Sequence, residues 1–360
     1  MHKSTRRTFL YGSAALGTSL LLHGCPQSSP PATESSPASG SSPTGGSSNA
    51  SGFKTAIVLP GIITDKAWNQ AGYEGVLVVK NKLGAQTDYV EKVSQADQAE
   101  SLSDFARRGY NLVYAHGGQF DAAVQQVAPQ FPNTFFVVVN GAATGNNIAS
   151  LRLNSLELGY LCGMIGASLS KSGRMAYLGG QEFEATTNEA RGFELGAKSV
   201  KPDMRVSVSF TGDWNDPAKA KEAFLALTSA GADVVYQWLD NAAPAVLQAA
   251  AEKGVYAFGN TTDQLDVAPK AVLTSAIKRI DLAIAYLADL ATQRKLEGKI
   301  YTIGLEQPDI VHLGKFGAAV TEPIQQKVMK AKDAIVAKTL TFEKCQEGGK
   351  STYCAKGTVA

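Results

Sequence analysis

Polar and aromatic residues follow nearly every short apolar run in the main body of this sequence. The runs are rich in Val, Ile, Phe and Tyr, as the buried strands of a parallel sheet are. Small ligands bind such sheets beyond the carboxyl ends of the strands. The residues that could offer a ligand hydrogen bonds, charge or ring stacking there are Asp65, Trp68, Asn69, His116, Asn140, Trp214, Asp240, Thr261, Asp263 and Lys278.

Two tryptophans in these loops favour a flat ligand. Trp68 and Trp214 come from different halves of the body, and each has Asp and Asn neighbours. Two rings that face each other across a cleft could sandwich a planar ring, with each stack contributing about 1–3 kcal/mol. The alternative is that both rings pack beneath their own loops. Their polar neighbours favour the stacking role.

The motifs of common enzymes are missing from the sequence. It has no Gly-x-Ser-x-Gly elbow, no phosphate-binding loop, no His-Glu-x-x-His and no dinucleotide glycine fingerprint. Asp65, Asp213, Asp240 and Asp263 could form an acidic cluster that hydrolyses a glycosidic bond or holds a cation. Hydrogen bonding to a polar ligand is the simpler role. We therefore expect no catalytic residue, no metal and no cofactor.

The elements that must position these side chains alternate between strands and helices. Strands are predicted at 55–60, 88–90, 112–116, 135–139, 150–153, 175–179, 205–210, 234–238, 256–259 and 272–276. Helices are predicted at 67–82, 95–108, 120–130, 156–171, 189–200, 217–230, 242–252 and 278–293. Such strand–helix–strand repeats predict parallel sheets with helices on both faces, and the number of strands requires two sheets. The glycines of the helix at 156–171 indicate close packing against a neighbouring helix.

The first 52 residues predict an export signal and a tether. Arg6 and Arg7 precede an apolar run that is too short to span a bilayer and that ends at Cys25. This pattern is typical of a twin-arginine signal peptide, residues 1–24, followed by a lipid-attachment cysteine. Residues 25–52 are almost wholly Ser, Pro, Gly, Ala and Thr, a composition that predicts a disordered tether. We expect an exported, lipid-anchored protein.

The charge argues against a nucleic-acid partner, and the cysteines favour a disulfide over a metal site. The formal net charge of +2 falls to about −1 once the signal is removed, which argues against a nucleic-acid partner. Cys162 is expected to be an inert core thiol. Cys345 and Cys354 flank a glycine-rich turn and are expected to form a disulfide. The alternative, a metal pair, lacks further ligands, since only His116 and His312 follow the signal.

The segment from Thr64 to Gly75 resembles the signature of the basic membrane protein (PnrA-like) lipoproteins, which are purine-nucleoside-binding proteins of ABC importers. The resemblance covers about residues 54–320. Further matches follow in the family's order: Arg191–Ala197, Thr211–Asp216, Gly231–Val234 and Ser275–Asp281.

The resemblance implies two Rossmann-like domains joined by hinge crossovers, as in type I periplasmic binding proteins. Residues 53–153 with about 281–306 would form the N-terminal domain, 154–280 with about 307–344 the C-terminal domain, and 345–360 a tail. The last segments would include strands near Tyr301 and Val311. The family holds its purine between two aromatic rings, and Trp68 and Trp214 match them.

The remaining site residues also carry implied roles. Asp65 and Asn69 match the acid and asparagine that bind the base edge, and Lys278 matches the lysine that reaches the sugar. The chain departs from the family pattern at Asn140 and at Asn260–Asp263, where carboxylates that would grip ribose are replaced by neutral groups. Neutral groups form weaker hydrogen bonds than carboxylates. His116 and the bulky tryptophans also change the pocket. The ligand is therefore expected to be a free purine base or a relative, with a nucleoside as the alternative.

These observations lead to one expected function and two alternatives. We expect a monomeric, lipid-anchored binding protein that delivers a purine base or nucleoside to an ABC permease. A tethered receptor that presents its ligand to a membrane sensor would share this sequence pattern. A nucleoside hydrolase built on the acidic cluster is the third reading.

Overall fold

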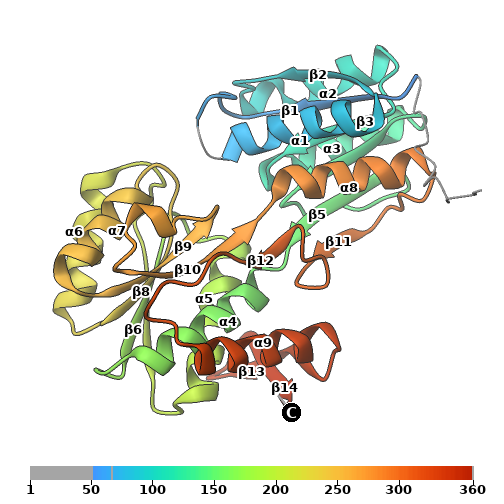
Figure 1. The fold of residues 1–360 in the computed structure, drawn as a ribbon. Helices are drawn as coiled ribbons and strands as arrows, with labels where there is room; N and C mark the ends of the chain where they lie inside the picture. Colours follow the sequence, from blue (N-terminus) through green and yellow to red (C-terminus); the bar gives the residue numbers. More distant parts are fainter. Residues whose placement is uncertain (1–51, 66–67, 359–360) are drawn as a thin grey trace, which may run out of the picture. The chain divides into compact units, whose positions relative to one another are not determined.

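The computed structural model describes residues 52–65 and 68–358. The predicted signal peptide, the lipid-attachment Cys25 and nearly all of the tether lie outside these residues. Figure 1 shows two β-sheets that are each covered by helices. The predicted α/β class with parallel sheets is confirmed.

The first sheet is parallel throughout. Its strands, in spatial order, are β11 (Ile300–Ile303), β5 (Ile148–Leu153), β4 (Phe135–Val139), β3 (Leu112–His116), β1 (Lys54–Val58) and β2 (Gln86–Val90). Its helices are α1 (Trp68–Leu83), α2 (Gln98–Arg107), α3 (Asp121–Val127) and α8 (Ile280–Thr292). Alternate strand residues belong to different cores: Ile57 packs with α1 and α8, whereas Ala56 and Val58 pack with α2 and α3. Both faces are therefore buried, which explains the continuous apolar runs.

The second sheet has the same design with one antiparallel edge strand. Its strands, in spatial order, are β12 (Val311–Leu313), β10 (Val272–Lys278), β9 (Tyr256–Thr261), β8 (Val234–Trp238), β6 (Arg174–Gly179) and β7 (Arg205–Phe210). Only β12 runs antiparallel to its neighbour among these strands. Its helices are α4 (Ser155–Leu169), α5 (Glu184–Val200), α6 (Pro217–Ser229), α7 (Ala243–Lys253) and α9 (Glu322–Val336), which packs on α4. Short 3₁₀ turns lie at Gln95–Asp97, Gly118–Phe120, Ala128–Gln130 and Leu265–Val267.

The chain passes between the two sheets three times: after β5, after β10 and after β11. Glu157, in the first turn of α4, links two of these crossings because its carboxylate accepts a hydrogen bond from the Leu305 backbone N–H at 3.0 Å. Burial, with a smaller contribution from nearby Glu306, raises the pKa of Glu157 to about 7. A second link is the ion pair between Arg152 of β5 and Glu184 of α5, at 3.2 Å.

Helices α4 and α5 pack with their backbones in direct contact. A side chain at Gly159 or Gly163 of α4 would collide with the backbone of α5 at Glu189 or Phe193. Gly192 and Gly196 of α5 lie equally close to the backbone of α4. The close packing expected from the sequence is confirmed at these two α4 glycines. Gly166 instead faces the sheet, where a Cβ would lie 2.6 Å from the terminal methyl of Met175.

Two predicted helix starts are corrected by the structure. Lys278 does not begin a helix but ends β10, where it pairs with Val311 of β12, and α8 begins at Ile280. Helix α5 begins at Glu184 rather than Glu189, since the Thr186 hydroxyl accepts a hydrogen bond from the Phe183 N–H and stabilises the earlier start. The start of α6 is as predicted: the Asp216 carboxylate caps it, and Pro217 is its first residue.

The C-terminal residues form a hairpin that the sequence reading leaves out. Strands β13 (Leu340–Glu347) and β14 (Lys350–Gly357) pair antiparallel across a two-residue Gly-Gly turn. The predicted tail boundary at residue 345 falls inside β13. The structure joins Cys345 to Cys354 across this hairpin, and Cys162 is a buried free thiol. Arg191 of α5 holds the hairpin by donating hydrogen bonds to the Tyr353 carbonyl at 2.8 Å and to the Glu347 carboxylate at 2.6 Å.

Candidate functional site

The loop between β1 and α1 is held by Asp65 and Asn69. The Asp65 carboxylate accepts hydrogen bonds from the Asn69 backbone at 2.9 Å, from the Asn69 side-chain amide at 2.7 Å and from the Gln70 backbone at 3.0 Å. The Asn69 side-chain oxygen accepts a bond from the Gly61 N–H at 3.0 Å. These two side chains therefore order the start of α1 and hold each other in place beside Trp68.

Trp68 stacks on His116, which follows β3. The two ring centroids lie 4.1 Å apart with 21° between the ring planes, and the His116 Nε2 lies 2.8 Å from the Trp68 carbonyl oxygen. A carbonyl can only accept, so Nε2 carries the proton. His116 is fully buried, and this burial lowers its pKa to about 4. The ring is thus neutral at physiological pH, and its Nδ1 has no hydrogen-bond partner within the described part of the chain.

The second sheet contributes three more aromatic rings. Trp214, in the loop after β7, lies 6.4 Å from Phe183 at an interplanar angle of 19° and 6.4 Å from Trp238 in an edge-to-face contact. The Trp214 ring also packs over Gly180, where a Cβ would collide with it. Phe183 is 56 % exposed, an unusual position for a large apolar side chain. Each predicted stacking tryptophan therefore has a ring neighbour on its own side.

Acidic residues from the two sheets approach each other in this region. The Asn241 side-chain amide, after β8, lies 3.4 Å from the Asp65 carbonyl oxygen. Burial raises the pKa of the neighbouring Asp240 to about 6, and the charge of Asp65 adds to this effect while Lys278 opposes it. Asp65 and Asp240 are therefore close enough to influence each other although they follow strands of different sheets.

Lys278 lies in a buried polar cluster. Its Nζ contacts the two Glu189 carboxylate oxygens at 3.0 and 3.2 Å and lies 3.0 Å from the centre of the Trp238 ring. The Glu189 carboxylate also accepts hydrogen bonds from the Tyr236 hydroxyl and, at 3.2 Å, from the Asn260 amide. The sequence reading named Lys278 but missed its partners. A polar side chain within an apolar strand, as at Tyr236 and Asn260, is the signal that could have indicated them.

The remaining predicted ligand residues lie at two places: Asn140 follows β4, whereas Thr261 ends β9 and Asp263 follows it. Asn140 is exposed and has a left-handed backbone with φ of 58°. Thr261 is also left-handed, with φ of 67°, and its hydroxyl donates to the Asn260 side-chain oxygen at 3.3 Å. The Asp263 carboxylate accepts bonds from the backbone of Leu265 at 3.2 Å and of Lys315 at 3.3 Å. Asp263 thus stabilises the loops around β12.

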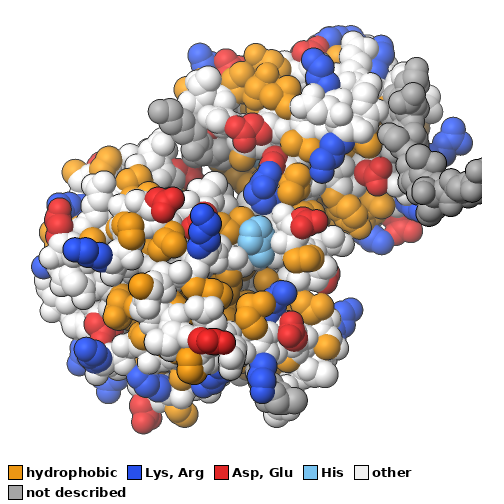
Figure 2. Space-filling view, viewed as in Figure 1, with side chains coloured by type: hydrophobic (Ala, Val, Ile, Leu, Met, Phe, Trp, Pro, Cys, Tyr) orange, Lys and Arg blue, Asp and Glu red, His pale blue; other side chains and the backbone are white. Residues whose placement is uncertain are grey.

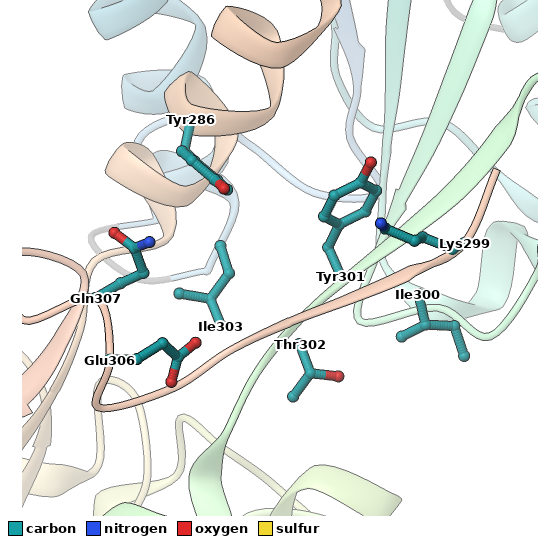
Figure 3. Close-up of a pocket in the computed structure, with 8 residues that line it drawn as sticks. All are labelled: Tyr286, Lys299, Ile300, Tyr301, Thr302, Ile303, Glu306 and Gln307. Atoms are coloured by element: carbon teal, nitrogen blue, oxygen red, sulfur yellow. The ribbon is translucent and has the colours of Figure 1, made fainter. Parts of the chain in front are cut away.

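Two surface pockets lie away from these residues. One, with a volume of about 310 Å³, lies beside β11, and Tyr286 of α8, Tyr301 and Glu306 contribute to its lining (Figure 3). A second pocket of about 770 Å³ has Arg279, Asp309 and His312 in its lining. Neither pocket is lined by a predicted ligand-binding residue. Figure 2 shows acidic and basic side chains interspersed over the face in view.

No group of three or more His, Cys, Asp or Glu side chains within residues 52–65 and 68–358 is placed to hold a metal ion. In the same part of the chain, no helix combines the length and apolar character needed to cross a bilayer.

Comparison with known families identifies the class of protein. Residues 53–345 match the family described as ABC transporter substrate-binding protein, PnrA-like. The chain therefore belongs to this family of substrate-binding proteins, as the sequence motifs predict.

Three relatives in sequence have different names. A transcriptional activator protein of Bacillus subtilis is 31% identical over 77% of this chain and 86% of its own. A purine-binding protein of Brucella abortus is 32% identical over 62% of this chain and 64% of its own. A nucleoside-binding ABC transporter protein of Lactococcus lactis is 28% identical over 93% of this chain and 98% of its own.

Solved structures show the same fold. A transcriptional activator of the comK gene from Bacillus halodurans superposes with a TM-score of 0.70 at 26% identity, covering 79% of this chain and 98% of its own. An ABC transporter solute-binding protein from Aeropyrum pernix has the same TM-score of 0.70 at 17% identity, covering 82% of this chain and 94% of its own.

Proposed function

We propose that this protein binds a purine, as a free base or a nucleoside, and delivers it to an ABC permease. The observation that carries the proposal is the set of aromatic rings on the loops after the strands of both sheets, accompanied by Asp65 and Asp240. Rings provide stacking for a planar base, and carboxylates accept hydrogen bonds from its edge. Membership of a family with purine- and nucleoside-binding relatives supports the same ligand class.

The proposed ligand site combines residues from both sheets. Trp68 and Trp214 stack on the base, while Asp65 and Asn69 bind its edge from the first sheet. His116 takes part by supporting the Trp68 ring from its buried face. Asp240 and Lys278 approach from the second sheet. Asn140, Thr261 and Asp263 complete the site on the side where a sugar would lie.

A free base is the preferred ligand within this class. A ribose diol is held best by carboxylates, since charge-assisted hydrogen bonds are stronger than neutral ones. Asn140 and Thr261 are neutral here, the Asn260 amide already donates to Glu189, and the Asp263 carboxylate already accepts two backbone N–H groups. Few acceptors remain for a sugar.

Calorimetry of ligand-free protein with adenine, guanine, adenosine and guanosine tests whether the ligand is a purine and whether it is the free base. We expect at least one purine to bind, with the base bound more tightly than its nucleoside. A clear preference for the nucleoside would overturn the free-base assignment alone. The absence of binding to all four compounds would overturn the purine assignment.

We further propose that ligand binding closes two domains about the three crossings. Residues 53–153 with about 281–306 would form one domain, and 154–280 with about 307–344 the other. Closure requires that the ligand bind the closed form more tightly than the open form. The protein is proposed to act as a monomer that is exported through its twin-arginine signal and anchored through lipid on Cys25.

A sensing role is the second candidate, because relatives in sequence and structure are named transcriptional activators. Uptake of radiolabelled purine by cells with and without the gene separates the two roles. Loss of uptake supports transport, whereas unchanged uptake with altered gene expression supports sensing. Hydrolysis is tested by incubating the protein with adenosine and assaying released adenine; we expect none.

A further inference from the structure

Glu189 is a fully buried carboxylate that the proposed function does not use. It lies on α5 and contacts Lys278, Tyr236 and Asn260, three side chains from three strands of the second sheet. An isolated buried carboxylate is costly, and it persists only where hydrogen bonds and an opposite charge compensate it. Burial raises the pKa of Glu189, and the contacts with Lys278, Tyr236 and Asn260 oppose that shift. All four oxygen contacts of Glu189 come from donors, so these contacts favour its ionised form.

Lys278 depends on this carboxylate for its charge. Its side chain is 3 % exposed, and burial lowers the pKa of Lys278 to about 8 while Glu189 opposes the shift. The other titratable groups that face the pair are Cys162 on α4, Asp240 after β8, and Tyr236 and Tyr177 on the sheet. Both tyrosines and the Cys162 thiol have pKa values raised by burial and stay neutral. Glu189 thus provides the carboxylate that directly contacts the Lys278 ammonium, at 3.0 Å.

The fold holds Glu189 rigidly. The backbone carbonyl of Glu189 lies against Gly159, at the close contact between α4 and α5. The Trp238 ring lies on another side of the lysine Nζ, with its centroid 3.0 Å away. An ammonium that lies against an aromatic face gains a further attraction while it remains charged.

We propose that Glu189 is the positioning residue of the ligand site: it keeps Lys278 protonated and fixes its ammonium against Trp238, where the ligand meets it. This inference rests on the proposed function, because it assumes that Lys278 contacts the bound purine or its sugar. Glu189 itself does not touch the ligand. It acts through the charge and position of the lysine.

The test compares the pH dependence of binding in wild type and Glu189→Gln. The amide keeps the size of the carboxylate but turns a donor toward Lys278 and removes the charge, so the buried lysine loses its proton near neutral pH, as unpaired buried lysines do at pKa values of about 5–6. We expect the variant to bind roughly 10- to 30-fold more weakly than wild type at pH 7.5 and to approach wild-type affinity near pH 5.5. The probes are adenine, guanine, adenosine and guanosine, measured by calorimetry.

Asp240 also titrates in this pH range. Each affinity is therefore expressed relative to wild type at the same pH, so that the effect of Asp240 titration that both proteins share cancels. Glu194→Gln is the matched control: Glu194 lies on the same helix and pairs with Lys198 and Arg191, but it is partly exposed. We expect its affinity to equal that of wild type at every pH. A Glu189→Gln variant with a constant affinity ratio across this pH range would overturn the inference.

A second comparison tests the inference without the single variant Glu189→Gln, which could fail to fold because it leaves a buried lysine unpaired. Lys278→Met and the double variant Glu189→Gln/Lys278→Met both lack the buried cation. If Glu189 acts only through Lys278, the two bind the probes equally; a double variant more than about threefold weaker shows a separate role and overturns the inference. If wild type binds none of the probes, the proposed function fails first, and this result is distinct from the others.

Discussion

At the scale of single residues, Trp68 carries the clearest consequence for binding. One face of its indole is covered by His116, so the stacking surface that remains is the opposite face. The ring is only partly buried, so we expect the strands of the first sheet to stay intact when it is removed. Because base–aromatic stacking is worth about 1–3 kcal/mol, Trp68→Ala should weaken purine binding by roughly 5- to 150-fold.

Calorimetry measures this loss, and circular dichroism checks that the variant is folded. Tyr73→Ala is a suitable control because Tyr73 is an aromatic residue of the same helix that packs against Tyr89. It should bind as wild type does. Unchanged affinity in Trp68→Ala would show that the indole serves packing alone.

The pKa of Glu157 gives a prediction about stability. Its pKa of about 7 lies above the value of about 4.3 in an unfolded chain, so the folded state prefers the protonated form. The stabilisation that this proton provides is complete below about pH 4 and is lost as the pH rises through 7. Glu157→Gln mimics the protonated form and should exceed wild type in stability at pH 8, by up to about 3 kcal/mol.

Urea unfolding at pH 4 and pH 8 measures the difference, which should vanish at the lower pH. Glu222→Gln removes an exposed carboxylate from α6 and should show no such pH dependence. An equal effect of Glu157→Gln at both pH values would mean that this carboxyl does not titrate in the expected range.

At the scale of elements, the glycines of α4 make different predictions according to what each contacts. Gly163→Ala would drive a methyl group into the backbone of α5, which cannot move aside, and should cost at least about 1–3 kcal/mol. Gly166→Ala meets side chains instead of backbone, namely the flexible end of Met175 at 2.6 Å and a methyl group of Val234 at 3.1 Å, so it should cost less. Thermal unfolding of both variants compares them directly, and equal losses would contradict the packing described for α4 and α5.

The elements also show what the sequence can predict. Strands β3, β4, β7 and β8 have the predicted bounds because their patterns between turn signals depend on local chemistry. β3, β4 and β8 are mostly apolar runs, whereas β7 alternates Val with Ser. The predicted helix start at Lys278 was wrong because a polar residue after an apolar run was interpreted as the beginning of a helix. Lys278 pairs instead with Val311 of β12, a residue distant in sequence that no local pattern indicates. The hairpin of β13 and β14 was missed because its strands are polar, although the Gly-Gly turn is a hairpin signal.

The sequence could predict those residues of the candidate site that follow from local patterns, but not the contacts between distant segments. Residues after strands can be read from the order of elements, and this places Asp65, Trp68, Asp240 and Lys278 near the proper sheet edges. Glu189 lies 89 residues from Lys278 in sequence, and no local pattern links them. Burial and charge pairing emerge only when α5 packs on the second sheet.

At the scale of the whole molecule, Cys25 predicts how the protein partitions between membrane and water. If Cys25 carries lipid, the mature protein should enter the detergent phase of a Triton X-114 extraction, and Cys25→Ser should move it to the aqueous phase. The double variant Cys345→Ser/Cys354→Ser serves as control, since it removes other cysteines and should remain with the detergent. Detergent partitioning of Cys25→Ser would contradict anchoring through this residue.

The placement of the indole rings has a practical consequence for all of these measurements. The chain contains three tryptophans, and Trp68, Trp214 and Trp238 all lie in the candidate site. Indole emission depends on the immediate surroundings of the ring. The tryptophan fluorescence of the protein, selected by excitation that tyrosine does not absorb, therefore arises from the candidate site alone, and an unlabelled sample carries its own optical reporter of occupancy.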